Sequence, residues 1–209
     1  MDHRDLMLAS SAAKPFERAG WIFELKYDGF RVLAMRSGME MRLLSRRGND
    51  LARWFPEIVA CVRELPNVVL DGELVVLDEK GKPEFERLSR RARTRNPISI
   101  EAATRSDPAA VFAFDLLSLR GKDVRGLPLL KRKELVADVL RNSQRIRPVQ
   151  YVGEQGQRLY DAASALELEG IVAKRADAPY KAGRSKDWIK ICTATGREMQ
   201  HRRSEAWDQ

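Results

Sequence analysis

One run, VVLDGELVVLD at residues 68–78, restricts the fold of this chain more than any other feature. It is too short to span a membrane, which needs about 18 apolar residues, and its β-branched content is typical of a buried strand. Asp71 and Glu73 fall on one face of that strand, where two carboxylates require a cation, a metal or a ligand hydroxyl as partner. A second D-G hairpin is the alternative, but its arms would be only about three or four residues long. The run therefore predicts a buried strand that carries part of a polar site.

Short strands and amphipathic helices make up most of the remaining chain. We expect further strands at 21–27, 30–35, 39–45, 111–119, 170–174 and 188–192, and helices at 55–65, 84–95, 129–141 and 157–168. The pair Asp28-Gly29 between the first two strands predicts a hairpin. Residues 193–209 are polar and show no clear periodicity. The order of elements favours an α+β fold with antiparallel hairpins over a regular βαβ alternation.

The net charge, the two cysteines and the two histidines narrow the range of possible functions. Lys and Arg number 38 and Asp and Glu 30, a formal net charge of +8 that favours a polyanionic partner such as nucleic acid, although such an excess also serves solubility alone. Two distant cysteines make no disulfide framework, and His3 and His201 lie too near the ends to favour a histidine triad or a zinc site. Because the sequence shows no secretory signal and no membrane span, we expect a cytoplasmic protein.

Charged residues at strand ends suggest a site. In ELKYDGFR, residues 24–31, Lys26 ends a strand and Arg31 follows the turn; nearby cations would lower the pKa of such a lysine and make it a nucleophile. Taken alone, this pattern more often reflects surface charges beside a turn. Similar groups recur in ELEGIVAKR and KDWIKIC, which contribute Glu169, Lys174, Lys186, Trp188 and Lys190. Together they suit a triphosphate with a metal ion.

Six motifs in order carry a resemblance to a known family: KYDGFR, LLSRRGND, VLDGELVVLD, VFAFDLLSL, EGIVAKR and KDWIKIC. The set resembles the adenylation domain of ATP-dependent DNA ligases, most of all the ligase module of bacterial end-joining ligases, over residues 6–192. The resemblance implies the two-subdomain covalent nucleotidyltransferase fold, an ATP-grasp-like α+β architecture with antiparallel sheets around a nucleotide cleft. Residues 1–192 would form that domain and residues 193–209 a polar tail.

The resemblance also implies roles for individual residues. Lys26 would attack the α-phosphate of ATP and carry the AMP, and Glu169 would serve the metal, Mg²⁺ or Mn²⁺. The expected nucleotide contacts are Glu24 at adenosine, Arg31 at the nucleotide and the nick phosphate, Arg46 at the ribose or a phosphate, Glu73 at the ribose hydroxyls, Phe114 against adenine, and Lys174 and Lys190 at the phosphates. Phosphoryl transfer of this kind needs positioning and cations more than bases.

Nicked double-stranded DNA is the expected partner, because the family passes AMP to the 5′-phosphate of a nick for sealing in DNA repair or recombination. The arginine-rich run at 87–95 is the candidate for backbone contact through Arg87, Arg90, Arg91 and Arg93; a solvated helix face is the alternative. Such contacts carry no sequence preference and weaken with salt.

Three features depart from the family pattern. Cys192 stands where a second lysine is usual, unless one residue is deleted there, and SRRG stands where SRNG is usual. Residues 193–209 are too few for the five strands of the OB-fold that normally follows. A separate chain would then supply the OB-fold or act as an end-joining partner. An RNA ligase, a GTP-using capping enzyme and a non-catalytic DNA-binding module stay open as alternatives.

Overall fold

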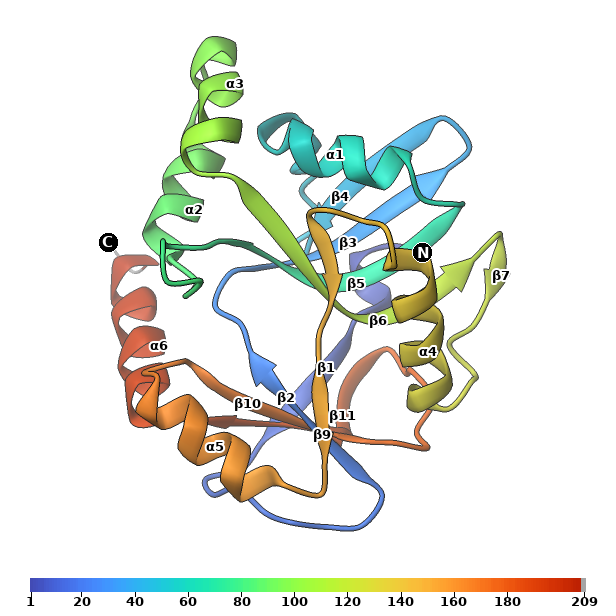
Figure 1. The fold of residues 1–209 in the computed structure, drawn as a ribbon, viewed down its shortest axis with the longest axis vertical. Coiled ribbons are helices and arrows are strands. Elements are labelled where there is room, and N and C mark those ends of the chain that lie inside the picture. Colours follow the sequence, from blue (N-terminus) through green and yellow to red (C-terminus); the bar gives the residue numbers. More distant parts are fainter. Residues whose placement is uncertain (208–209) are drawn as a thin grey trace. The chain divides into compact units, whose positions relative to one another are not determined.

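Two units make up the structure, a computed structural model that describes residues 1–207, with side chains described for residues 1–201 (Figure 1). The first unit combines Met1–Leu6, Asp28–Val149 and Pro179–Gly183. The second combines Met7–Tyr27, Gln150–Ala178 and the chain from Arg184 on. Each unit has its own sheet and its own helices, so the α+β prediction is confirmed.

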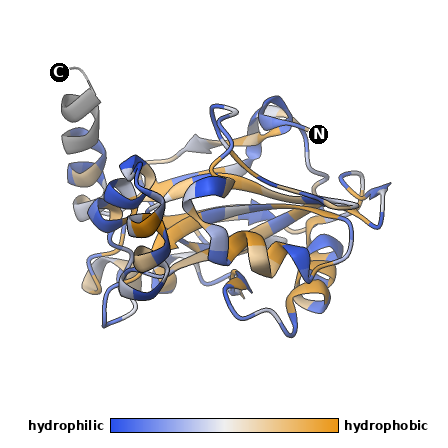
Figure 2. Ribbon diagram, turned by 90° about the horizontal axis from the view of Figure 1, so that it is seen from above, coloured by the Kyte–Doolittle hydropathy of each residue, from blue (hydrophilic) through white to orange (hydrophobic). Residues whose placement is uncertain are grey.

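The sheet of the first unit is built around the apolar run at residues 68–78, which was predicted to be a buried strand. Its strands are ordered β4-β3-β5-β6-β7, with β8 parallel to β6. Their bounds are β3 Phe30–Ser37, β4 Glu40–Ser45, β5 Val68–Val76, β6 Ala109–Leu119, β7 Lys122–Asp123 and β8 Ile146–Pro148. Every residue of β5 except Glu73 is buried, which confirms the buried strand and excludes the short hairpin. The hydrophobic character of the strands is visible as orange ribbon in Figure 2.

Helices cover this sheet through apolar faces. The helical segments of the first unit are η1 His3–Asp5, η2 Ala52–Trp54, α1 Pro56–Arg63, α2 Phe85–Arg93, α3 Pro97–Ser106 and α4 Leu129–Leu140. Ile58 of α1, Leu88 of α2 and Val136 of α4 are fully buried in the core that β5 and β6 share. Apolar residues at helical spacing predict α1, α2 and α4. Helix α3 escapes that pattern, although Asn96 caps it and Pro97 begins it, as is common at a helix start.

The second unit is a smaller sheet with two helices. Its strands are ordered β1-β11-β10-β2-β9. The bounds are β1 Met7–Ser11, β2 Trp21–Lys26, β9 Tyr151–Gly153, β10 Gly170–Arg175 and β11 Gly183–Cys192, with α5 Gly156–Ala165 and α6 Ala194–Trp207. Phe23, Ile171 and Ile191 form its core together with Ala163 of α5. The backbone of residues 194–207 is helical, although the sequence after Cys192 shows no clear periodicity.

The predicted hairpin at Asp28-Gly29 is also wrong. β2 pairs with β10 and β9, whereas β3 pairs with β4 and β5, so the two strands belong to different sheets. Gly29 lies where a Cβ atom would approach the Leu74 carbonyl oxygen to 2.1 Å. The glycine therefore serves a close backbone approach, which uses the same residue type as a tight turn. Among the described residues, no helix is long and apolar enough to cross a membrane.

Candidate active site

One face of the second unit's sheet collects charged side chains. The antiparallel register sets Lys26 opposite Gly170, Glu24 opposite Val172, and Lys174 opposite both Ile22 and Trp188. Because side chains alternate between faces, one face carries Glu24, Lys26, Lys174, Trp188, Lys190 and Cys192. The neighbouring positions, Phe23, Ile171 and Ile191, point into the apolar core. The structure thus brings the predicted lysines of this unit onto one face.

The Lys26 amine meets a buried carboxylate. Its Nζ lies 2.5 Å from Oε2 of Glu169, whose side chain is 3% exposed, while the Lys26 side chain is 23% exposed. The register explains the pair, since Glu169 directly precedes Gly170, the partner of Lys26. Gly170 has φ +151°, and a Cβ atom there would come within 2.2 Å of the Ile191 carbonyl oxygen. Only glycine fits so close an approach of the two strands. The Lys26 amine is therefore oriented by Glu169 and still accessible to solvent.

A second ion pair lies deeper on the same face. Lys174 Nζ is 2.7 Å from Glu24 Oε2, and both side chains are only 2% exposed. The ammonium also lies 4.1 Å from the centroid of the Trp188 ring, within the range of a cation–π interaction. Glu24 therefore balances the charge of Lys174. Lys190 is half-buried further along the face, where its carbonyl oxygen accepts a hydrogen bond from the Ala12 N–H at 3.0 Å.

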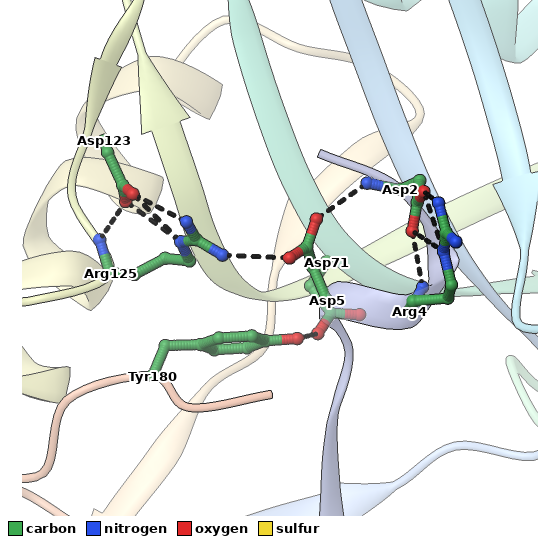
Figure 3. Close-up of polar contacts among 7 residues, drawn as sticks. All are labelled: Asp2, Arg4, Asp5, Asp71, Asp123, Arg125 and Tyr180. Carbon is green, nitrogen blue, oxygen red and sulfur yellow. Dashed lines mark hydrogen bonds and ion pairs between the residues drawn. The ribbon is translucent and has the colours of Figure 1, made fainter. Parts of the chain in front are cut away.

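Arg31 is fixed by a buried carboxylate in the first unit. Its Nε and Nη2 donate to the two oxygens of Asp71 at 3.0 and 2.7 Å. The Tyr180 hydroxyl donates to Asp71 Oδ2 at 2.6 Å, a contact drawn in Figure 3. Burial alone would lower the pKa of Arg31, but the charge of Asp71 and its hydrogen bonds raise it above its ordinary value. A cation partner was expected for the β5 carboxylates. For Asp71, that partner is Arg31.

Three other predicted contacts lie around Arg31. Glu73 is its direct partner in the β3–β5 register. The Arg31 guanidinium carbon lies 5.4 Å from the centroid of the Phe114 ring. Arg46 donates its backbone N–H to the Arg31 carbonyl oxygen at 3.2 Å, and its side chain is exposed. The structure therefore sorts the predicted site residues into two sets, one in each unit.

The arginines of α2 do not share one environment. Arg91 is 3% exposed; it pairs with Glu57 and donates to the carbonyl oxygens of Trp54 and Asp107, both at 2.9 Å. A buried arginine with these partners cannot reach a phosphate, so the predicted DNA contact of Arg91 is wrong. Arg87 is 26% exposed and pairs with Glu84 at 2.7 Å. Arg90 and Arg93 are exposed and stay predicted contacts.

Sequence reasoning missed several polar residues near these sets. Tyr180 also donates its N–H to the Arg125 carbonyl oxygen at 2.8 Å, and Arg125 in turn pairs with Asp5 and Asp123 (Figure 3). Asp115 and Arg132 form an ion pair with no exposure on either side chain. Asp115 stands inside the motif VFAFDLLSL quoted above, whereas Tyr180 lies outside the quoted motifs, and neither carries a signal of its partner. Those partners follow only from the tertiary fold.

Carboxylates that could hold a metal are few at Lys26. Among the described residues, no group of three or more His, Cys, Asp or Glu side chains is placed to bind a metal ion. Glu169 is the carboxylate at the lysine, and its two oxygens meet Lys26 and Gln200. Any metal ion would therefore take most of its ligands from a substrate or from water.

Comparisons with known proteins agree on one family. The model of the ATP dependent DNA ligase domain matches residues 6–192. A DNA ligase of Thermococcus fumicolans is 34% identical over 81% of this chain and 32% of its own length. The multifunctional non-homologous end joining protein LigD of Pseudomonas aeruginosa is 34% identical over 88% of this chain and 21% of its own length.

A solved structure gives the same result for the fold. The structure described as mycobacterial DNA ligase D complexed with ATP and MES is 30% identical, with a TM-score of 0.76, and covers 92% of this chain and 61% of that one. This chain spans about a third of the length of the first curated relative and about a fifth of the second. Both relatives carry further sequence that it does not match. The predicted nucleotidyltransferase architecture is confirmed.

Proposed function

Because the chain belongs to the ATP-dependent DNA ligase domain family, with residues 6–192 matched, we propose that it takes AMP from ATP onto Lys26 and passes it to the 5′-phosphate of nicked double-stranded DNA. The observation that carries this proposal is the Lys26–Glu169 pair at 2.5 Å, which presents an oriented, partly exposed amine at the end of β2. The direct test is the mass of the intact protein after incubation with ATP and Mg²⁺, where a gain of one AMP supports the proposal.

The proposed first step is a displacement at phosphorus. The Lys26 ammonium first gives one proton to water; the amine then forms a bond to the α-phosphorus of ATP and gives a second proton to water as the phosphoramidate forms. The bond from that phosphorus to the bridging oxygen breaks, and pyrophosphate leaves with the electron pair. Holding the amine in one place removes much of the entropic barrier of such a reaction. Glu169 supports this by fixing the amine from a buried position.

Nucleotide contacts are proposed from both sets of residues. The likeness to a ligase solved with ATP supports ATP as the donor. Lys174 and Lys190 are proposed phosphate contacts, and Glu24 a contact of adenosine. In the first unit Arg31, Arg46, Glu73 and Phe114 are the proposed contacts. Arg31 is suited to this because the two hydrogen bonds that it donates to Asp71 hold its guanidinium in one orientation before any ligand arrives.

The donor chemistry at Lys26 fits a magnesium ion. Mg²⁺ in nucleotide sites uses one or two carboxylates together with substrate phosphates and keeps several waters. Glu169 supplies one such carboxylate, and Mn²⁺ accepts similar ligands. When bound, the ion would neutralise charge that develops on the phosphates. Glu169 then serves two groups, the lysine amine and the metal.

The acceptor strand and any protein partner are proposed on the family. A basic chain suits a phosphate-rich duplex, and the net charge of +8 provides the attraction. Because the relatives are longer than the matched region, sealing of the nick is proposed to involve protein beyond residues 6–192, such as an OB-fold or an end-joining partner.

DNA contact by α2 has a measurable consequence. Replacing Arg90 and Arg93 together by alanine is expected to lower the slope of log affinity against log salt by about 1.8, since each lost phosphate contact removes about 0.9. Arg90 is 66% exposed and only weakly held, 3.8 Å from Asp107, so it is free to turn toward a phosphate. The measurement is fluorescence anisotropy with nicked duplex DNA between low and physiological salt.

A charge-matched control separates a local contact from the net charge. Replacing Arg141 and Arg147 by alanine removes the same charge from exposed positions, one directly after α4 and one on β8. That variant should keep the slope of the unmodified protein. Equal slopes in all three proteins would show that α2 does not contact DNA.

A further inference from the structure

Thr193 and helix α6, which follows it directly, hold Glu169 at its backbone and at its side chain. At the backbone, the Thr193 N–H donates to the Glu169 carbonyl oxygen at 3.1 Å, and the Thr193 hydroxyl donates to the Leu168 carbonyl oxygen at 2.6 Å. Gly196 lies so close that a Cβ atom there would come within 1.9 Å of the Glu169 carbonyl oxygen. The first turn of α6 is thereby fixed against the residue that precedes β10.

The side chain of Glu169 is held from the same helix. Gln200 Nε2 donates to Glu169 Oε1 at 2.8 Å, while the other oxygen, Oε2, pairs with Lys26 at 2.5 Å. The Gln200 amide also lies 3.4 Å from the Cys192 sulfur. An amide nitrogen carries two hydrogens, so both contacts are possible at once. Each carboxylate oxygen of this buried group therefore has a different partner.

Two anchored oxygens fix the rotation of the carboxylate. A buried carboxylate that loses a hydrogen-bond donor leaves one oxygen unsatisfied, and the group turns to recover a partner. Any such turn moves the oxygen that holds the Lys26 amine. Groups that orient a reacting side chain through its neighbour often have a large effect on rate with little effect on substrate affinity.

We propose that Gln200 is a positioning residue, which fixes the Glu169 carboxylate and through it the Lys26 amine before ATP is attacked. This inference rests on the proposed function of Lys26. It assigns to the segment after Cys192 a part in the first chemical step. In this role Gln200 acts through Glu169, to which it donates a hydrogen bond.

The test uses two variants of similar size in the full chain. Gln200→Leu removes the donor while leucine favours the helix, and Gln200→Glu replaces the donor with a like charge beside Glu169. Formation of lysyl-AMP is followed in a single turnover over a range of ATP concentrations with Mg²⁺. We expect both variants to lower the maximal rate by about tenfold, the effect of one lost hydrogen bond to a charged group. The ATP concentration at half-maximal rate should change by less than about twofold.

A second readout needs no catalysis. In the protein without nucleotide or metal, modification of lysines by an amine-reactive reagent is mapped by mass spectrometry. Lys26 is reachable, with 23% of its side chain exposed, but its amine is occupied by Glu169. We expect Gln200→Leu to raise the modification rate of Lys26 severalfold relative to Lys190 in the same molecule.

Controls and outcomes keep this inference apart from the proposed function. Glu198→Ala, at an exposed position of the same helix, should leave both readouts unchanged, and thermal unfolding should show the variants folded. Unchanged rates in both Gln200 variants overturn the positioning role, and so does a slower rate with unchanged Lys26 modification. If the unmodified chain forms no lysyl-AMP, the proposed function fails, and Lys26 modification still decides whether Gln200 fixes the amine.

Discussion

Substituting Lys26 by arginine is expected to abolish the AMP adduct that the unmodified chain forms with ATP and Mg²⁺. Arginine keeps a cation for the buried Glu169 carboxylate, so the variant should stay folded. Its guanidinium does not lose a proton in proteins and so offers no nucleophilic nitrogen. Intact-protein mass spectrometry after incubation with ATP and Mg²⁺ measures the adduct, and the unmodified protein provides the reference.

Lys131 provides the matched control for this result. Its side chain is 64% exposed on α4, where it pairs with Glu134, and Lys131→Arg should keep the full adduct. An adduct that survives in Lys26→Arg would place the nucleophile on another lysine. An adduct missing from the unmodified protein as well would contradict the proposed function itself.

Replacing Arg132 by methionine is expected to lower the free energy of unfolding by about 3–5 kcal/mol, the usual loss when one partner of a buried ion pair is removed. Arg132 Nε and Nη2 donate to the two oxygens of Asp115 at 2.6 and 2.9 Å, and neither side chain is exposed. Without the guanidinium, Asp115 stays in the core as an unpaired charge. Urea unfolding followed by circular dichroism gives the size of the effect.

The pair between Arg141 and Asp138 shows what an exposed ion pair contributes. Its atoms are 2.8 Å apart, but the side chains are 76% and 64% exposed. Arg141→Met should therefore change the stability by less than about 1 kcal/mol. A small loss in Arg132→Met, similar to that of Arg141→Met, would mean that the Asp115 carboxylate finds another partner.

The strands of this protein were largely predictable because their signal is local. The run at residues 68–78 alternates faces and is apolar enough to require burial, and β5 occupies Val68–Val76. Asp71 also predicted a partner, since a carboxylate in such a strand requires a partner such as a cation. The identity of that cation, Arg31, depends on the register between β3 and β5, which the sequence does not state.

Sheet membership and arginine burial were not predictable for the same reason. Asp28-Gly29 has the local pattern of a hairpin, but the pairing partners of β2 and β3 lie far along the chain in different sheets. Arg91 resembles its exposed neighbours on α2 until Glu57 of α1 is placed against it. Long-range partners decide both outcomes.

Part of the candidate site lay outside any motif. Lys26 and Glu169 stand in recognisable runs, and their family roles suggested that they share a site, although not that they form a direct ion pair. Gln200 comes from a segment whose polar residues show no periodicity, so no sequence pattern indicated that it belongs to the site. Its meaning follows from one contact with Glu169 at 2.8 Å.

The division of the chain between the units also sets an order of folding. Most of the first unit is one continuous stretch, Asp28–Val149, whereas the second unit needs Met7–Tyr27 and Gln150–Ala178 to meet across it. Closing so long a loop is slow and entropically unfavourable unless the intervening chain is already compact. We expect the first unit to fold early and, once compact, to bring β2 and β10 close together. The nucleophile and its carboxylate would then be among the last groups in the molecule to meet.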